Sequence, residues 1–537
     1  MSLGRFFACT CPALFALAAA AGCVTSDQGA GPTPQAAPGA GEAKNVILMV
    51  SDGIGFNGWL AADYYQGLAG RQSYQITRPG GAQPLVFGMT HDALNPVDAA
   101  GALVAEGGSA ADAVRQGYDP ATRWQRFEAT FLNDFAPVAQ AYTSYTDSAA
   151  SGTALMTGQK TVNGRINMDW SGQVAFPAIG QIALDQGRAV GVVASVMASH
   201  ATPASVISHN RSRNNYEEIF AEMLASDLAV IMGAGHPFYN ANGAPLGPGD
   251  TPDFQYVGGE ETMDALTRPG GIDGVTFIDA KAQFEALALS EAPPRRVVGI
   301  ARSSSTLQAA RQGLASADTP SGMALNPAVP DLATMGLGAL NVLSQNREGF
   351  FLMIEGGAVD WMGHANSMPR FIEEQIDFNA AVDAVIAWVE DNSSWEETLL
   401  IVTSDHECGG IWGLGTWTNS EGGPVATDRE VESLLAARFD PAEDAFNDFL
   451  AVQDRGAGAL PGYQFASGNH TNELVPLWAL GRGAAAFAGS ARRDAKAAEL
   501  WGAPYGWSGL FVDNTDVFSV MEAALTGSEA GGERVTP

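Results

Sequence analysis

The chain has 537 residues, of which 46% are hydrophobic, and its formal net charge is -31 at pH 7. This length provides a core large enough for one big domain or two ordinary ones. The acidic balance argues against nucleic acids and anionic membrane surfaces as binding partners, because both favour Lys and Arg. An anionic substrate would need a locally positive site, which metal ions can supply.

The N-terminal segment is typical of an export signal. Residues 1–23 combine one Arg, an apolar run too short to span a membrane, and small residues before Cys23. The sequence AAGC at 20–23 resembles a bacterial lipoprotein box, so we expect lipid on Cys23 and export to the periplasm or cell surface, with anchoring to the outer membrane by lipid only. Ordinary signal-peptidase cleavage is the alternative.

The rest of the chain divides by composition. Residues 24–43 are rich in Pro, Gly and Ala and predict a flexible linker. A folded domain is expected over 44–525, and a disordered tail over 526–537.

Within the domain, short apolar runs alternate with helical patterns. The runs lie at 44–52, 189–197, 228–233, 350–355, 398–405 and 474–481, and the clearest helical pattern lies at 371–392. Buried strands that alternate with helices predict an α/β fold, a three-layer sandwich with a largely parallel central sheet flanked by helices, with large surface insertions. Residues from about 65 to 138 show no obvious core strand and predict a long insertion, and the section from about 236 to 295 is expected to be irregular.

Several of these runs end in side chains that bind metals. Asp52 and Glu355 each end one run, and Asp405 and His406 end another. Functional residues collect at the carboxyl ends of the strands in an open α/β sheet. Asp360 and His364 are four residues apart, so one helical turn would place both on one face, and carboxylate with imidazole suits zinc.

The remaining histidines differ in their surroundings. His470 lies in a small polar loop, from which it could approach a metal. We expect His91, His209 and His236 to be structural, since no acid or second His lies beside them at ligand spacing.

The sequence YTDSAASGTALMTG at 145–158 places Ser148 at the expected start of a helix among small residues. Small residues allow a ligand to approach closely, and a helix N-terminus favours an anion. A simple Asp/Ser helix cap is the structural alternative.

Taken in order, the motifs resemble those of the alkaline phosphatases. They are NVILMVSDGIG, TDSAASGTALMTG, HATPASVISHNRSR, EGGAVDWMGH, TSDHE and GNHT, which occur between about Lys44 and Leu480. The resemblance implies a metal-dependent enzyme that hydrolyses phosphate monoesters through a phosphoserine intermediate, with two zinc ions and one magnesium ion, and a homodimer as is typical of the family.

The resemblance also implies a role for each matching residue. Ser148 would be the nucleophile and Arg213 would clamp two phosphate oxygens, with Arg211 as the rival for that role. The expected metal ligands are Asp360, His364 and His470 for one zinc; Asp52, Asp405, His406 and the Ser148 oxygen for the other; and Asp52, Thr202 and Glu355 for magnesium.

Two positions depart from the best-known enterobacterial members. His200 stands where those enzymes have Asp, and Trp361 stands where they have Lys. We expect an altered third metal site, with His200 beside the ligands or binding a third metal, and with Trp361 either lining the phosphate pocket or packing.

Other functions remain open at the level of sequence. A phosphodiesterase or phosphonate hydrolase of the same superfamily would share the metal core, but many of these use Thr as nucleophile and lack the Arg. A sulfatase is disfavoured because its modified Cys/Ser motif has no counterpart around Ser148. An inactive lipoprotein that binds metal or phosphate is the non-enzymatic alternative.

Overall fold

A computed structural model describes residues 42–528, except for 79, 105–108, 116, 125–144, 314 and 414–449. The expected export signal with Cys23, nearly all of the expected linker and most of the expected C-terminal tail lie outside the described residues. In the described part of the chain, no helix has the length and apolar character needed to cross a membrane.

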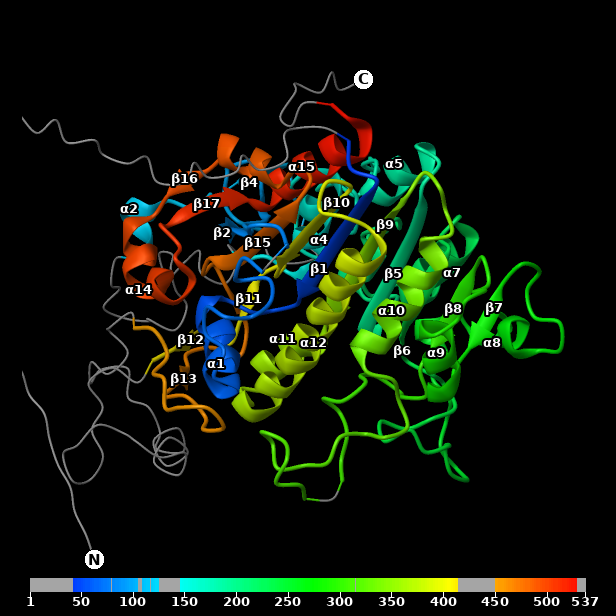
Figure 1. The fold of residues 1–537 in the computed structure, drawn as a ribbon. Helices are drawn as coiled ribbons and strands as arrows, with labels where there is room; N and C mark the ends of the chain where they lie inside the picture. The colour runs from blue at the N-terminus through cyan, green and yellow to red at the C-terminus, as the bar shows by residue number, and fades with distance from the viewer. Residues whose placement is uncertain are drawn as a thin grey trace, which may run out of the picture. The chain divides into compact units, whose positions relative to one another are not determined.

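A sheet of eleven strands forms the centre of the fold (Figure 1). In spatial order the strands are β16 (Arg492–Arg493), β17 (Leu510–Asp513), β2 (Leu85–Thr90), β15 (Val475–Gly481), β10 (Thr398–Thr403), β1 (Asn45–Ser51), β9 (Phe350–Gly356), β5 (Ala189–Met197), β6 (Val230–Ala234), β8 (Val297–Ile300) and β7 (Thr276–Ile278). From β10 to β7 every neighbouring pair is parallel, whereas β15 runs antiparallel to both of its neighbours. The expectation of a largely parallel sheet is confirmed.

Helices cover both faces of this sheet, because its central strands are apolar on both sides. All seven residues of β1 are buried, and alternate residues of a strand point to opposite faces. Ile47 and Met49 belong to one buried cluster, and Val46 and Leu48 belong to the other. The three-layer sandwich predicted from the sequence is therefore confirmed.

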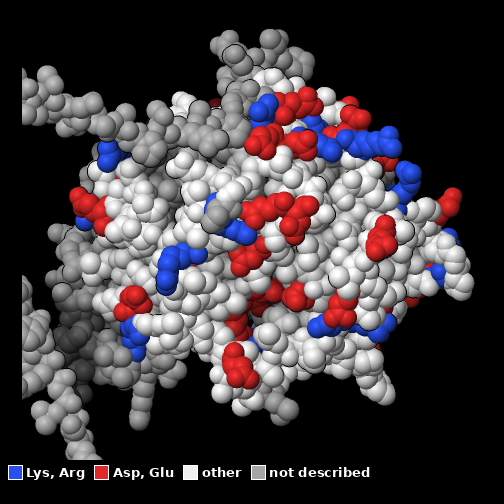
Figure 2. Space-filling model, in the orientation of Figure 1, with Lys and Arg blue, Asp and Glu red and all other residues white. Residues whose placement is uncertain are grey.

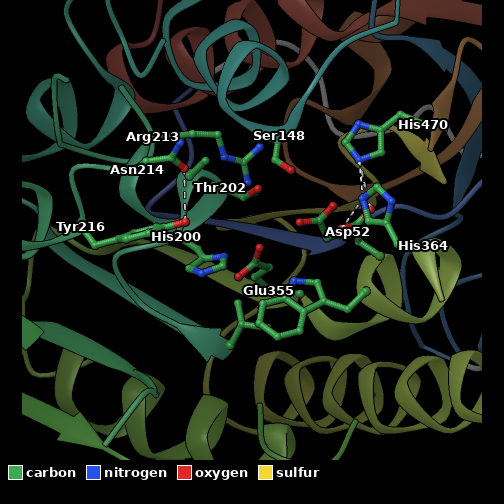
Figure 3. A pocket seen from close by; sticks show the side chains of 15 residues that line it. Asp52, Ser148, His200, Thr202, Arg213, Asn214, Tyr216, Glu355, His364 and His470 are labelled. Atoms are coloured by element: carbon green, nitrogen blue, oxygen red, sulfur yellow. Dashed lines mark hydrogen bonds and ion pairs between the residues drawn. The ribbon is translucent and has the colours of Figure 1, made fainter. Parts of the chain in front are cut away.

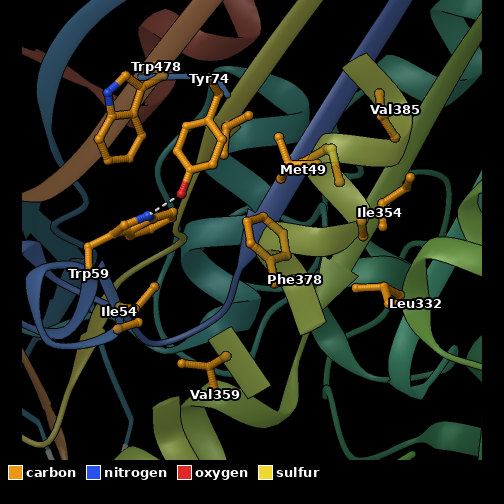
Figure 4. Close-up of a cluster of buried hydrophobic side chains, with 14 of the residues drawn as sticks. Met49, Ile54, Trp59, Tyr74, Leu332, Ile354, Val359, Phe378, Val385 and Trp478 are labelled. Atoms are coloured by element: carbon orange, nitrogen blue, oxygen red, sulfur yellow. Dashed lines mark hydrogen bonds between the residues drawn. The ribbon is translucent and has the colours of Figure 1, made fainter. Parts of the chain in front are cut away.

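The first cluster joins the sheet to α1 (Phe56–Gln66), α9 (Lys281–Ala288), α10 (Leu332–Leu343), α12 (Met368–Asn392) and α14 (Ala495–Tyr505). Figure 4 shows part of it, where Met49 and Ile354 of the sheet meet Phe378 and Val385 of α12. The second cluster joins the sheet to α4 (Ser148–Thr157), α5 (Ile179–Asp185), α6 (Ala201–Ala204), α7 (Tyr216–Ala225), α8 (Glu260–Thr267) and α15 (Asn514–Thr526).

Short elements complete the described fold. They are α2 (Pro120–Arg123), α11 (Ala358–His364), the 3-10 helices η2 (Gln255–Val257) and η4 (Ala484–Gly489), and three two-stranded ladders: β3 (Leu94–Val97) with β4 (Asp112–Arg115), β11 (Glu407–Cys408) with β14 (His470–Thr471), and β12 (Ile411–Trp412) with β13 (Gln464–Phe465).

Two expectations about irregular regions are wrong. The section from 65 to 138 contains β2, which lies inside the central sheet between β15 and β17. Its sequence LVFGMT is interrupted by Gly88, whose Cβ position would lie 2.9 Å from the Trp507 ring, so close packing accounts for the residue that weakens the strand pattern. The section from 236 to 295 contains α8, α9 and the edge strand β7, whose three residues are too few for a periodic signal.

Candidate metal and phosphate site

The carboxyl ends of four neighbouring strands build the site. β10, β1, β9 and β5 lie side by side and parallel, so the residues that follow them meet at one edge of the sheet. Asp52 follows β1, and Glu355 is the penultimate residue of β9. Asp405 and His406 follow β10, and His200 with Thr202 follow β5.

A first cluster joins α11 to β14. Asp360 and His364 lie one turn apart on α11, as their spacing predicts. The Asp360 Oδ2 atom is 3.5 Å from His364 Nε2, and the Asp360 Oδ1 atom is 3.3 Å from His470 Nε2. The two Nε2 atoms are 3.1 Å apart. Their Nδ1 atoms contact the main-chain oxygens of Gly468 and Thr146, which fixes both rings with Nε2 towards Asp360.

A second cluster surrounds the imidazole of His406. Its Nε2 atom lies 3.5 Å from Asp52 Oδ1, 3.2 Å from Asp405 Oδ2 and 3.1 Å from Ser148 Oγ. Asp52, Asp405 and His406 are all buried. Three ligand atoms therefore converge beside the serine hydroxyl.

The local fold places Ser148 at the first residue of α4, as the sequence predicts. Asp147 caps the helix by accepting a hydrogen bond from the Ala150 amide at 2.9 Å, and its other oxygen accepts one from the Gly164 amide at 2.9 Å. Asp147 therefore performs the capping function, which leaves the Ser148 hydroxyl free to face the second cluster.

A cavity of about 540 Å³ connects these groups. Figure 3 shows Ser148, Arg213, Asp52, His364 and His470 around it. Arg213 lines the cavity, and its Nη1 atom is 3.2 Å from Asp147 Oδ2. Arg211 is exposed and lies near Gln173 instead. The geometry thus directs Arg213, and not Arg211, towards the serine.

The third set of predicted residues lines the same cavity. Thr202 Oγ1 is 3.5 Å from Asp405 Oδ2, and Glu355 is buried beside them. The His200 ring lies 5.6 Å from the Trp361 ring and stacks on Tyr216 at 5.2 Å. Tyr216 and Asn214, which were not predicted from the sequence, also line this cavity. The structure therefore places His200 and Trp361 in an aromatic wall of the cavity.

The electrostatics of the site fit bound cations. Burial, followed by the charge of Asp405, raises the pKa of Asp52 well above its usual range and the pKa of Glu355 to about 8. Burial lowers the pKa of His406, which keeps the imidazole neutral, as a metal ligand must be. The Glu355 Oε2 atom is buried without a hydrogen-bond partner among the described residues. Crowded carboxylates with unused oxygens are the donor set that Zn²⁺ and Mg²⁺ require.

The negative charge of the protein makes positively charged groups necessary at a site for an anionic ligand. On the face drawn in Figure 2, acidic side chains gather near the middle, with basic side chains beside them at several places. The chain has 59 acidic and 28 basic residues, so a phosphate ester would be repelled at long range. Arg213 and the cations would supply the local positive charge.

The other histidines lie elsewhere in the structure. His91 Nε2 contacts the Glu473 main-chain oxygen at 2.7 Å, and His209 contacts Glu222. His236 lies 3.4 Å from Asp279. None of the three lines the cavity.

Besides Tyr216 and Asn214, the site residues Asp147 and Cys408 were missed at the level of sequence. Asp147 holds Arg213, and its position directly before Ser148 was the available signal. Cys408 lies with Asp360, His364 and His470 so that one ligand atom of each falls within 4.8 Å of the others. Its position two residues after His406 was the only signal, because the pairing that brings it to the cluster is not local.

A serine at a helix start, an arginine and two clusters of metal-ligand side chains at the carboxyl edge of a parallel sheet define the class of metal-assisted hydrolases. The family model for alkaline phosphatase matches residues 115–500. Alkaline phosphatase 4 of Bacillus subtilis is 28% identical over 383 residues, which cover 64% of this chain and 73% of the relative. The alkaline phosphatase of Escherichia coli is 27% identical over 383 residues, covering 68% and 70%.

Among solved structures, the alkaline phosphatase of the Antarctic bacterium TAB5 superposes with a TM-score of 0.54 at 20% identity, covering 91% of this chain and 99% of that one. The chain belongs to the alkaline phosphatase family. Its membership supports a phosphatase hydrolase that depends on metal ions.

Proposed function

We propose that the protein hydrolyses phosphate monoesters to an alcohol and inorganic phosphate through a phosphoserine on Ser148. One observation carries the proposal: the Ser148 hydroxyl lies 3.1 Å from His406 Nε2, at the first residue of a helix and at the wall of a cavity that Arg213 also lines. The family membership supports the same reaction class.

Each residue has a defined task in this reaction. Ser148 Oγ releases its proton to solvent and attacks phosphorus, the ester P–O bond breaks, and the departing alkoxide takes up a proton from solvent to leave as the alcohol. Water then attacks the phosphoserine, which releases phosphate and restores the hydroxyl. Arg213 holds two phosphate oxygens with its planar guanidinium, and the ion pair with Asp147 orients that guanidinium.

We assign the metal ligands from the two clusters and from the residues that line the cavity. Asp360, His364 and His470 would hold one zinc; Asp52, Asp405 and His406 would hold the second beside Ser148; and Asp52, Thr202 and Glu355 would hold magnesium. These cations, when bound, stabilise the deprotonated serine and the charge on the transferring phosphoryl group. His200 lines the same cavity as Thr202 and Glu355, and imidazole is a poorer neighbour for magnesium than a carboxylate.

Two further parts of the proposal rest on sequence and family alone. Lipid on Cys23 would anchor an exported protein to a membrane, for which we expect the outer membrane; the motif at 20–23 supports the lipid anchor. A homodimer is supported only by family membership.

The test compares p-nitrophenyl phosphate with bis-p-nitrophenyl phosphate, with Zn²⁺ and Mg²⁺ supplied, for wild type, Ser148→Ala and Ser171→Ala. Ser171 bonds to Asp169 away from the cavity and serves as the matched control. We expect strong preference for the monoester, a loss on the order of 10³-fold or more in Ser148→Ala, and no change in Ser171→Ala.

Two results would contradict the proposal. Preference for the diester would replace the substrate class with that of a phosphodiesterase. Metal binding without hydrolysis of either ester would favour the inactive binding protein. Acid-quenched labelling with radioactive phosphate, located on the peptide that contains Ser148, distinguishes a phosphoserine from direct attack by water.

A further inference from the structure

The short ladder of β11 and β14 brings a thiol to the first metal cluster. The two strands pair antiparallel, and Cys408 lies directly opposite His470. Residues directly opposite each other in such a pair project to the same face, with Cβ atoms about 4.5–5.5 Å apart. On the other face, Thr471 donates to the Glu407 carboxylate across the same ladder. The backbone pairing therefore aims the Cys408 side chain to the same side as His470.

A glycine on α11 allows this thiol to reach the cluster. Gly363 lies in the helical turn between Asp360 and His364, and a Cβ placed on it would lie 3.1 Å from Cys408 Sγ. With hydrogen at this position, the turn that carries two metal-ligand side chains rests directly on the sulfur. The ligand atoms of Asp360, His364, Cys408 and His470 consequently lie within 4.8 Å of one another.

We propose that Cys408 is a fourth protein ligand of the zinc held by Asp360, His364 and His470. This inference rests on the metal site of the proposed function and adds a sulfur donor to it. As the sulfur–metal bond forms, the S–H bond breaks and the proton leaves to solvent.

The donor set has consequences for the metal. A Zn–S bond is longer than a Zn–N bond, about 2.3 Å against 2.0–2.1 Å, and the 4.8 Å span of the four ligand atoms would accommodate such a sulfur donor. One soft ligand in place of a water shifts the preference of the site towards zinc and away from hard cations such as Mg²⁺. With four protein ligands, the ion would have to become five-coordinate to bind phosphate, as zinc in catalytic sites can do in the transition state.

Cobalt substitution tests this assignment by spectroscopy. The full-length protein is stripped with a chelator and titrated with Co²⁺, and absorption is recorded in the visible and near-ultraviolet regions for wild type, Cys408→Ser and Cys23→Ser. A thiolate bound to Co²⁺ produces a near-ultraviolet charge-transfer band, whereas imidazole and carboxylate ligands produce only visible d–d bands. We expect the charge-transfer band in wild type and in Cys23→Ser, and complete loss in Cys408→Ser with the visible bands retained.

The remaining outcomes separate this inference from the proposed function. Visible bands without a charge-transfer band in wild type would overturn the ligation by Cys408, while monoester hydrolysis with zinc in the same preparation would leave the proposed function standing. A charge-transfer band that persists in Cys408→Ser would also overturn it, since another thiol would then be its source. Absence of any cobalt spectrum together with absence of hydrolysis would overturn both. The visible bands of Cys408→Ser report that the variant has folded.

Discussion

Removal of the Arg213 guanidinium is the sharpest test of how the cavity binds phosphate. We compare Arg213→Ala and Arg213→Lys with Arg211→Ala, because Arg211 is an exposed arginine two residues away that does not line the cavity. Lys keeps the charge but loses the planar pair of donors. The three variants therefore separate charge, geometry and mere proximity.

The size of the effect follows from the structure. A hydrogen bond to a charged group contributes about 1.5–3 kcal/mol. Two such bonds to phosphate would give more, but the Arg213 side chain is 25% exposed, and water screens part of the gain. We therefore expect removal of the guanidinium to cost about as much free energy as one such hydrogen bond. At 1.4 kcal/mol per factor of ten, this cost corresponds to a decrease of about 10- to 150-fold in kcat/KM.

The assay measures kcat/KM with p-nitrophenyl phosphate and inhibition by inorganic phosphate. We expect Arg213→Ala to lose about 10- to 150-fold, Arg213→Lys to lose less, and Arg211→Ala to stay close to wild type. Phosphate inhibition should weaken in the same order. Equal losses in Arg211→Ala and Arg213→Ala, or unchanged phosphate inhibition in Arg213→Ala, would refute the assignment of the clamp.

Two further predictions concern stability. Burial raises the pKa of Glu355 to about 8 and that of Asp405 to about 6, so the metal-free folded chain holds protons that the unfolded chain releases near its ordinary values of 4.5 and 3.8. The Tm of chelator-treated protein should therefore fall as the pH rises from about 4 to about 8. With Zn²⁺ and Mg²⁺ present, the Tm should fall less over the same range. The same slope of Tm against pH with and without metal would contradict this reasoning. Gly349→Ala should lower the free energy of unfolding by about 2–5 kcal/mol, since Gly349 has φ of 93° and its Cβ would lie 1.8 Å from the Lys44 carbonyl oxygen. Gly101 has φ of 81° but no atom near its Cβ position, so Gly101→Ala should cost only about 1–2 kcal/mol, measured by urea unfolding. Equal losses at both positions would show that the overlap of the new Cβ at position 349 with the Lys44 carbonyl oxygen is relieved without cost.

The central strands were predictable because a strand that is buried on both faces consists of a continuous run of apolar residues. β1, β5, β9, β10 and β15 follow this rule. β2, β8 and β17 did not stand out, since β8 and β17 have four residues each and β2 contains a glycine that close packing requires. A four-residue strand depends on its neighbours for order, and those neighbours are distant in sequence.

Much of the site was predictable for a related reason. Strand ends collect at one edge, so Asp52, Glu355 and Asp405 could be grouped without coordinates. The choice between Arg213 and Arg211 depended on a loop conformation, which the structure fixes through the hydrogen bond from the Arg213 amide to the Gly164 carbonyl at 2.9 Å. The placement of Cys408 depended on a two-residue ladder, for which no sequence period exists.

The neighbouring positions of β1 and β10 also bear on how the chain acquires its metals. Asp52 and Asp405 follow strands that are adjacent in the sheet but separated by most of the domain in sequence. An unfolded chain therefore offers no local chelating segment for this pair of ligands, and long-range strand pairing must come first. A cation that binds only the folded chain raises the unfolding free energy in proportion to the logarithm of its free concentration. The availability of its metal ions in the compartment where the protein folds should therefore affect its stability there as well as its catalytic competence.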